Sequence, residues 1–261
     1  MRCRARHPYD VKVKSLAAEE RAAWLLGQLK ASKSVTLAEA AAALDVSEMT
    51  VRRDLSALEE AGIARRVRGG AVYLGPVSFS GRERSHSEEK AVIAQKLRPM
   101  VPTAGVIAMD SSTTMHRLAA SLSSAEDLTV VTNGLSTFQV LQDVPGVTAI
   151  LTGGAADRRS DSLVGPVATA FLENMRFSAF FASTAALDER ACYEDTLEEA
   201  EIKRAFARSS GKVVVGAHTD KLDGEATAAS IGLAQIAVLA TELLPSAAEL
   251  RPYGLIVASV V

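Results

Sequence analysis

Cationic and hydroxyl-bearing side chains that could contact DNA lie close together in the first quarter of the chain. Val51, Leu55 and Leu58 recur at helical spacing, which predicts one helix with these three side chains on its buried face. In a helix that enters the major groove, arginine can donate two hydrogen bonds to guanine, and threonine can bond a base or contact a thymine methyl group. The candidate contacts on the other faces are Ser47, Glu48, Thr50, Arg52 and Arg53. This pattern predicts a helix that reads base edges.

A second group of cationic side chains follows in residues 63–74, which alternate like a short hairpin around Gly69 and Gly70. The arginines of this segment are Arg65, Arg66 and Arg68. A hairpin beside the helix would place them along the adjacent phosphates or in the minor groove.

Three short helices must hold these side chains in place. Thr36 and Glu39 have the spacing of a capping box, which predicts that a second helix starts at Thr36. Ser47 can cap the third helix, so the turn between the two is only Asp45-Val46, short enough for a helix-turn-helix. Asp54 is expected to hold an arginine of the third helix or the hairpin by charge-assisted hydrogen bonds. The alternative is a three-helix packing module whose arginines are only solvated.

The charge distribution separates two parts of the chain. Residues 1–75 carry 13 Lys and Arg against 9 Asp and Glu, whereas residues 76–261 carry 16 against 22. A basic first part and an acidic second part suggest that only the first meets a polyanion. The hydrophobic fraction of 48% is that of a globular protein, and the basic leader is followed by no apolar targeting segment, so we expect a cytoplasmic protein.

Metal and disulfide chemistry find little support in the sequence. The two cysteines exclude a disulfide scaffold and a structural zinc cluster. The four histidines are scattered and have no ligand spacing, so no metal and no cofactor are predicted.

Short apolar runs alternate with helical stretches after residue 87, which predicts parallel βαβ units and a doubly wound sheet. The strands are expected near 106–109, 128–132, 147–151, 179–183, 212–217 and 236–240, with 254–259 as another; the helices are expected near 88–98, 113–122, 135–142, 167–174 and 198–209. The resulting division is a flexible basic leader (1–17), a DNA-binding domain (18–74), a Gly/Pro/Ser-rich linker (75–87) and an effector-sensing and oligomerisation domain (88–261).

Polar loops follow three successive predicted strands of the second domain. Ligands of open α/β sheets bind at the carboxyl ends of the strands, where hydroxyl groups, free helix amides and glycines suit a phosphate. The candidate effector contacts in these loops are Asp110, Ser111, Ser112, Thr113, Thr114, Asn133, Gly134, Gly153 and Gly154. Serine, threonine and glycine are also ordinary turn residues, so the site is inferred from the three loops together.

The segment from Thr36 to Tyr73 resembles the winged helix-turn-helix of DeoR-type bacterial transcription regulators, through the string Thr50-Val51-Arg52-Arg53-Asp54-Leu55 and the later Gly69-Gly70-Ala71. The second half is similar to the DeoR-type sensor domain in the Asp110-Ser-Ser-Thr-Thr loop, in VVTNGL, in LTGG, and in Glu199 with Lys203. The resemblance covers roughly residues 18–240.

The resemblance implies an α/β fold, with a winged helix-turn-helix followed by a mostly parallel, Rossmann-like sheet domain related to ribose-5-phosphate isomerase. It also implies a phosphorylated sugar or related metabolite as effector, with Lys203 and Lys221 as anion partners. Glu199, one helical turn before Lys203, could orient that lysine, although a surface ion pair is the plainer interpretation.

Three positions around the expected pocket depart from the DeoR pattern. Ser112 stands where the family usually has glycine, Ser183-Thr184-Ala185-Ala186 stands where it has two glycines, and His218 stands where it has aspartate. The departures leave two alternatives, a different ligand or a pocket that has lost sugar-phosphate binding. His218 is interpreted as a hydrogen-bonded loop histidine, with a pH-sensitive ligand contact as the alternative.

These observations predict a DNA-binding transcription regulator, a repressor of carbohydrate metabolism genes. We expect it to bind a double-stranded operator as a homodimer or homotetramer and to release it with a phosphorylated sugar. The alternative from another class is a sugar-phosphate isomerase fused to a DNA-binding domain, with Asp110, Glu199 and Lys203 in catalytic roles. A third hypothesis is an architectural DNA-binding protein whose second domain only oligomerises.

Overall fold

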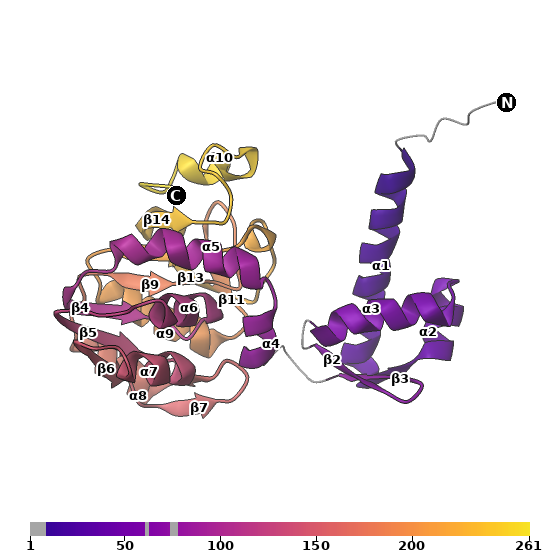
Figure 1. The fold of residues 1–261 in the computed structure, drawn as a ribbon, viewed down its shortest axis with the longest axis horizontal. Coiled ribbons are helices and arrows are strands. Elements are labelled where there is room, and N and C mark those ends of the chain that lie inside the picture. The colour runs from indigo at the N-terminus through magenta and orange to yellow at the C-terminus, as the bar shows by residue number, and fades with distance from the viewer. Residues whose placement is uncertain (1–8, 61–62, 74–77) are drawn as a thin grey trace. The chain divides into compact units, whose positions relative to one another are not determined.

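The computed structural model describes residues 9–60, 63–73 and 78–261, and the chain divides into two compact units (Figure 1). The first unit spans Met1–Ser85 and the second His86–Val261. The boundary between them falls inside the linker predicted at 75–87. Among the described residues, no helix is long and apolar enough to cross a membrane.

The first unit is a bundle of helices with a small sheet. Its elements are α1 (Tyr9–Ser32), β1 (Ser34–Thr36), α2 (Leu37–Leu44), α3 (Glu48–Glu60), β2 (Ala64–Val67), β3 (Gly70–Tyr73) and α4 (Phe79–Arg84). The strands form an antiparallel sheet in the order β1-β3-β2, so the predicted hairpin is present and β1 joins it as a third strand. Helices α2 and α3 with this hairpin form a winged helix-turn-helix.

Local sequence explains where these helices begin and how they pack. The side chain of Thr36 accepts the amide of Glu39, and the Glu39 side chain accepts the Thr36 amide, which confirms the predicted capping box. Asp45 ends α2 in the left-handed conformation, with φ of 50°. Val51, Leu55 and Leu58 are buried as predicted.

Two differences from the predicted boundaries concern helices. α1 begins at Tyr9, so residues 9–17 of the predicted leader belong to a helix, while residues 1–8 lie outside the described residues. The predicted linker at 75–87 contains α4, whose first turn Ser78 caps by accepting the Gly81 amide. The composition suggested a loop, but the Ser78 cap stabilises the first turn of a short helix there.

The second unit is built on a six-stranded parallel sheet. Its strands are β4 (Ala104–Met109), β5 (Asp127–Thr132), β6 (Val147–Leu151), β9 (Phe180–Ala182), β12 (Val213–Gly216) and β14 (Ile236–Ala240), in the order β14-β12-β9-β4-β5-β6. The first strand of this sheet, β4, lies in its middle. The next strands, β5 and β6, follow on one side of β4, and β9 lies on the other side. The carboxyl ends of β4 and β9 therefore flank the point where the strand order reverses, which is where open α/β sheets bind ligands.

Helices cover both faces of this sheet because successive strand residues point to opposite faces. Helices α5 (Ser87–Leu97), α6 (Thr113–Ala120) and α7 (Leu135–Gln142) pack on one face, in a core that contains Ile107 and Met109. Helices α8 (Pro166–Glu173) and α9 (Leu197–Arg208) pack on the other face, in a core that contains Ala108 and Phe180. Each of these five helices lies within two residues of its predicted position.

Short strands outside the main sheet were not predicted. β7 (Ala155–Asp157) pairs with β8 (Ser162–Val164), and β10 (Ala186–Leu187), β11 (Ala191–Glu194) and β13 (Ala228–Gly232) form a second antiparallel sheet. The chain ends in α10 (Arg251–Gly254) and the segment after it.

The strand predicted at 254–259 is wrong. Tyr253 and Val257 turn into the core instead, and only the last residues run beside β14. There the Leu239 amide donates to the Ser259 carbonyl at 2.9 Å, and the Val261 amide donates to the Leu239 carbonyl at 2.9 Å.

Candidate functional site

Helix α3 presents cationic side chains to solvent. Arg52 and Arg53 are exposed, and Met49 is 64% exposed beside them. Among the described residues neither arginine has an ion pair or hydrogen-bond partner through its side chain. The buried stripe Val51, Leu55 and Leu58 holds the opposite face of α3 in the core. The fold thus leaves two guanidinium groups free to meet an external anion.

Ser47 and Thr50 form the amino end of α3. The Ser47 Oγ accepts the Thr50 amide at 3.2 Å and lies 3.0 Å from the Thr50 Oγ1. Ser47 therefore caps the helix, as its position predicted, and its hydroxyl oxygen is already engaged. Glu48, the first residue of α3, is exposed.

The hairpin β2–β3 carries Arg65, Arg66 and Arg68, all exposed. Arg66 is tied to α3, because its backbone amide and its Nε both donate to the Glu59 carboxylate and its Nη1 donates to Ser56 Oγ at 2.9 Å. The backbone amide of Arg66 and its side chain hold the pKa of Glu59 below its ordinary value. This contact attaches the wing to α3, while Arg65 and Arg68 have no described partner.

Asp54 pairs with an arginine, but not with the one expected. Its carboxylate accepts from Arg21 on α1, with Nε 2.8 Å from Oδ2 and Nη2 3.3 Å from Oδ1. The prediction placed the partner on α3 or the hairpin. The acid on α3 instead fastens α3 to the first helix, 33 residues earlier in the chain.

In the second unit, Asp110 joins the ends of the two strands at the reversal point. Its Oδ1 accepts the Ser112 amide at 2.9 Å, and its Oδ2 accepts the Ser183 amide, just after β9, at 2.8 Å. Asp110 is 1% exposed. The carboxylate therefore holds the loops after β4 and β9 together.

Lys203 of α9 completes this arrangement. Its Nζ donates to the Ser183 carbonyl at 2.7 Å and to Glu194 Oε2 at 2.8 Å, and it lies 3.2 Å from Asp110 Oδ2. Burial would lower the pKa of Lys203, but Glu194 and Asp110 raise it above its ordinary value. The expected partner Glu199 is not among these contacts. Glu194 takes that place, and burial raises its own pKa.

Sequence reasoning missed Glu194 because it lies on the short strand β11, outside any motif. The alternating burial of β11, in which Cys192 and Glu194 face inward, is the signal that could have revealed it. Ser230 of β13 supports the carboxylate by donating to Glu194 Oε1 at 3.0 Å.

Lys221 approaches the same loops from the turn after β12. Its Nζ donates to Ser183 Oγ at 2.9 Å. Burial of the ammonium, with the charges of Lys203 and Lys90, lowers the pKa of Lys221 to about 7. Lys90, in the first turn of α5 and 3% exposed, was not among the predicted site residues although its charge acts on the same group.

His218 precedes Lys221 in this turn and is 7% exposed. Burial, and then the charges of Lys221, His86 and Lys90, lower its pKa to about 3. The interpretation of His218 as a hydrogen-bonded loop histidine is incomplete, because its Nδ1 is buried with no hydrogen-bond partner.

The hydroxyl loop after β4 is mostly committed to the start of α6. Ser112 Oγ accepts the Met115 amide at 3.2 Å, so the serine that replaces the usual glycine caps the helix. The neighbouring side chains of this loop are buried: Ser111, Thr113 and Thr114. The amide of Ser112, the cap residue of α6, donates to Asp110.

The loops after β5 and β6 are less directly joined to Asp110. Gly134 lies against Ser111, because a Cβ on Gly134 would be 2.7 Å from the Ser111 Cα. Asn133 donates to the Leu163 carbonyl at 3.2 Å, and its Oδ1 is buried without a partner. Gly153 and Gly154 adopt φ of 76° and 116°, which favours glycine. The structure thus brings the β4 and β5 loops into contact.

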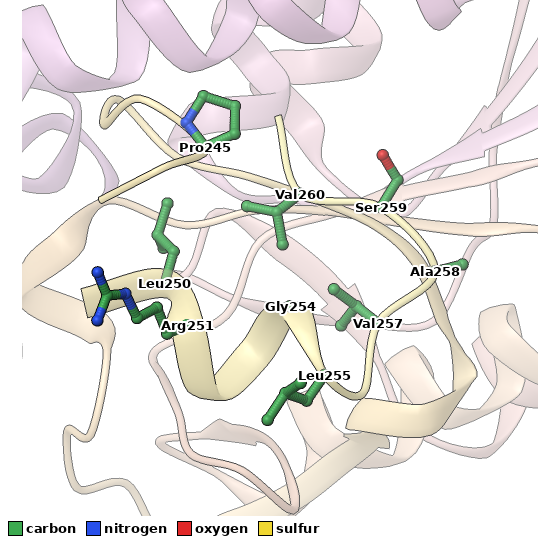
Figure 2. A pocket seen from close by; sticks show the side chains of 9 residues that line it. All are labelled: Pro245, Leu250, Arg251, Gly254, Leu255, Val257, Ala258, Ser259 and Val260. Atoms are coloured by element: carbon green, nitrogen blue, oxygen red, sulfur yellow. The ribbon is translucent and has the colours of Figure 1, made fainter. Parts of the chain in front are cut away.

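A cavity of about 580 Å³ lies elsewhere in this unit (Figure 2). Its walls come from Pro245, Leu250, Arg251, Gly254, Leu255 and residues 257–260, with Arg251 as the charged member. No predicted effector residue lines it, so we base the ligand site on the contacts at the strand ends.

The comparisons with known proteins agree with this two-part organisation. Residues 21–77 match the family model described as a DeoR-like helix-turn-helix domain, and residues 85–242 match the DeoR C terminal sensor domain. The chain is 33% identical to the HTH-type transcriptional regulator GolR of Listeria innocua over 85% of this chain and 90% of that protein.

Two further similarities are a curated relative and a solved structure. The chain is 33% identical to a lactose phosphotransferase system repressor of Staphylococcus aureus over 67% of this chain and 73% of that protein. Ribose 5 phosphate isomerase A from Neisseria gonorrhoeae is a structural neighbour with a TM-score of 0.34 and 15% identity, covering 51% of this chain and 52% of that chain.

Proposed function

Because this chain belongs to the DeoR family of transcriptional regulators, we propose that it represses carbohydrate metabolism genes and releases its operator when the second unit binds a phosphorylated sugar. Its similar relatives are named as transcriptional regulators or repressors and not as enzymes. One of them is named as a repressor of a lactose phosphotransferase system, which supports a carbohydrate effector for this chain.

The DNA-binding half of the proposal rests on the exposed face of α3 and on the wing. Arg52 and Arg53 are free to donate to base edges, and Thr50 lies at the amino end of the same helix. Arg65 and Arg68 would contact phosphates, while Arg66 holds the wing against Glu59. Ser47 would contribute by starting the helix and Glu48 by its place in the first turn.

The effector half rests on one observation: the buried ammonium of Lys221 lies at the strand reversal point, where it donates to Ser183 Oγ and forms no ion pair with a carboxylate of the described residues. Burial, and then the charges of Lys203 and Lys90, lower the pKa of Lys221, and the charges of Glu194 and Asp110 offset only part of this. A dianionic phosphate would supply the missing negative charge. Lys221 donates one hydrogen bond to a described residue, so two of its three N–H groups remain for a ligand.

Lys203 has a different role in this proposal. Its three donors already meet Ser183, Glu194 and Asp110, so direct contact with an effector would break one of these bonds. Lys203 therefore positions the loops after β4 and β9. Ser111 and the α6 amides would meet the sugar phosphate from the β4 loop, together with Gly134 after β5 and Gly153 and Gly154 after β6.

The quaternary arrangement is part of the proposal. One winged helix makes too few base contacts for high specificity, and symmetric dimers match paired half-sites. If the effector weakens operator binding, the operator must weaken effector binding by the same factor.

Two variants test the halves separately. Arg52→Ala with Arg53→Ala should weaken specific binding to the DNA upstream of the protein's own gene by about 1–3 kcal/mol for each arginine, measured by fluorescence anisotropy at constant salt. The same variant should keep the rise in melting temperature that a sugar phosphate produces. Lys221→Met should show the reverse, with operator binding retained and the ligand-induced shift lost.

Arg98→Ala is the control, because Arg98 is an exposed arginine of the second unit that bonds Ser123. Unchanged specific binding by the double arginine variant would contradict the recognition-helix assignment. A panel of sugar phosphates that leaves the melting temperature of the wild type unchanged would contradict the effector assignment.

A further inference from the structure

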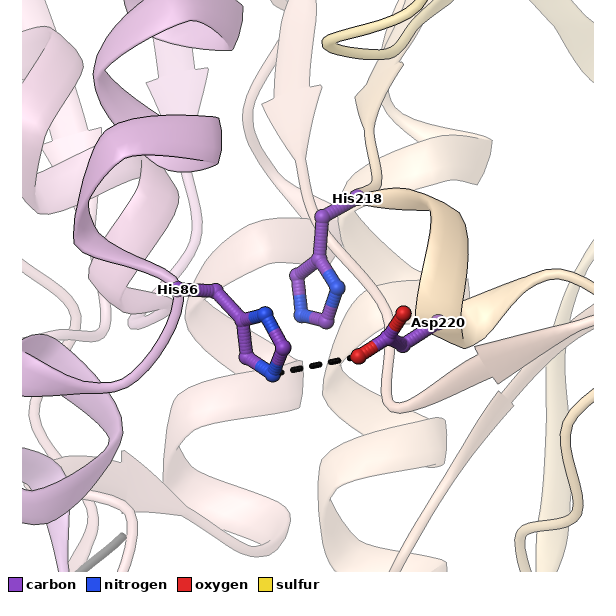
Figure 3. Close-up of side chains that lie close together, drawn as sticks. All are labelled: His86, His218 and Asp220. Carbon is purple, nitrogen blue, oxygen red and sulfur yellow. Dashed lines mark ion pairs between the residues drawn. The ribbon is translucent and has the colours of Figure 1, made fainter. Parts of the chain in front are cut away.

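Two histidines and an aspartate meet on the second unit, in and beside the turn that carries Lys221 (Figure 3). His86 immediately precedes α5, whereas His218 and Asp220 belong to the turn after β12. Their separation in the sequence is why ligand spacing predicted no metal. The fold brings one ligand atom of each residue within 4.8 Å of the others.

The distances in this cluster fit ligands of one ion. His86 Nε2 lies 3.3 Å from Asp220 Oδ2. Two ligands at roughly 2.0–2.1 Å from a tetrahedral metal lie about 3.3 Å apart, so this pair already has the required separation. The His86 and His218 rings stack with centroids 4.2 Å apart at 14°, and a ring nitrogen of His218 lies within 4.8 Å of the ligand atoms of His86 and Asp220.

The surroundings of the two rings support the same conclusion. Histidines that bind metals usually direct their other ring nitrogen at a carboxylate, and His86 Nδ1 lies 3.8 Å from Glu89 Oε1. His218 is 7% exposed and its Nδ1 has no hydrogen-bond partner, which is costly unless another group binds it. The carboxylates of Glu89 and Asp220 both lie near His86, and they bring negative charge to the position that a cation would take.

The geometry points to a Zn²⁺ site formed by His86, His218 and Asp220, with a fourth position open to water. Two imidazole nitrogens and one carboxylate oxygen are ligands that suit Zn²⁺ rather than Mg²⁺ or Ca²⁺. A bound ion would join the first residue of the second unit to the turn that carries Lys221. The inference does not depend on the identity of the effector.

The test is Zn²⁺ titration by calorimetry of the full chain, freed of any affinity tag and treated with chelator. We expect one Zn²⁺ per chain, and a loss of affinity of about 100-fold or more in His86→Gln and in Asp220→Asn. The absorption spectrum of the Co²⁺ form should lack the thiolate charge-transfer band that Cys3 or Cys192 would produce. His116→Gln, a histidine of α6, is the matched control and should bind as the wild type does.

His218→Gln should also lose binding, but this buried side chain could affect folding. The side chains of His86 and Asp220 are 34% and 69% exposed, so their variants decide the question with melting temperatures measured without metal. Absence of Zn²⁺ binding by the wild type, equal affinity in His86→Gln and Asp220→Asn, or a thiolate band with Co²⁺ would each overturn the site.

Discussion

Positive charge is handled differently in the two units. In the first unit, Arg52, Arg53 and Arg68 are exposed and make no ion pair with a described residue. In the second unit, Lys203 is 7% exposed and its ammonium contacts a carbonyl and two carboxylates. The two units carry opposite net charge. They also differ in how these cations are held, because the three arginines of the first unit are exposed and have no ion pair among the described residues, whereas Lys203 in the second is buried and paired.

This difference corresponds to two kinds of anion. Exposed arginines can track a phosphate backbone, and their contribution falls as salt rises because counterions are released. Buried lysines paired with carboxylates are hardly screened, so they hold loops in a set geometry for a small ligand. The two ion pairs that fasten α3, Arg21 to Asp54 and Arg66 to Glu59, show that the first unit also uses charge for positioning, but away from its free arginines.

Lys203→Met is the strongest challenge to this comparison. It would leave Glu194 and Asp110 buried without their cation, and breaking such a pair costs about 3–5 kcal/mol. Urea unfolding of the second unit should show this loss. Arg208→Ala removes an exposed cation 3.9 Å from Glu201 and should change the stability by less than about 1 kcal/mol. Equal losses in the two variants would mean that burial does not distinguish them.

Arg68→Ala tests whether the exposed arginines of the first unit contact DNA phosphates. Arg68 lies in the turn of the wing, and loss of one phosphate contact should reduce the slope of log affinity against log salt by about 1. Operator and unrelated DNA should lose affinity alike, measured by anisotropy over a range of salt. Arg98→Ala in the second unit should leave the slope as it is, and a reduced slope there would place DNA contacts outside the first unit.

Helix caps offer a smaller, matched test across the units. Thr36 caps α2 within a full capping box, while Thr196 caps α9 by accepting only the Glu199 amide at 3.2 Å. Thr36→Ala should destabilise the first unit by about 1 kcal/mol, and Thr196→Ala should cost the second unit somewhat less. Denaturant curves for the two variants check this, and a larger loss at Thr196 would contradict it.

The smallest expected effect concerns Glu59. Its folded pKa lies below the ordinary 4.5, so its stabilising contact is present above pH 4.5 and is lost as pH falls through the folded value. Arg66→Met should raise the pKa of Glu59 only part of the way, because the Arg66 amide still donates at 2.9 Å. NMR titration of the carboxyl group measures this; a full return to 4.5 would assign the shift to the guanidinium alone.

Much of the fold was predictable because the signals were local. The six strands of the main sheet are short, mostly apolar runs, and β6 and β14 begin and end where predicted. The two-residue strand β10 has no such signal, since two residues cannot show a periodicity. The apolar run after Gly254 was wrongly predicted as a strand, because a buried strand and an irregular buried segment look alike in sequence.

Part of the candidate site was predictable from two separate signals. Asp110 was singled out by the strand-end loops and Lys203 by the resemblance to the DeoR sensor domain, and the structure joins them through Ser183. The partners Glu194 and Arg21 were missed, because each reaches its ion pair through tertiary contact rather than spacing. The pairing of His86 with His218 depends on the same kind of contact.

The hydrogen bonds of Leu239 with Ser259 and Val261 determine which edge of the main sheet remains open to another strand. An edge strand offers unpaired backbone groups to any extended segment, including one from a second copy. Ser259 and Val261 already bond the backbone groups of Leu239 in the edge strand β14. The strand at the opposite edge, β6, has no strand of the main sheet beyond it. A strand from another chain would therefore have to pair with β6, and a substitution that detached residues 259–261 would expose the edge of β14 as well.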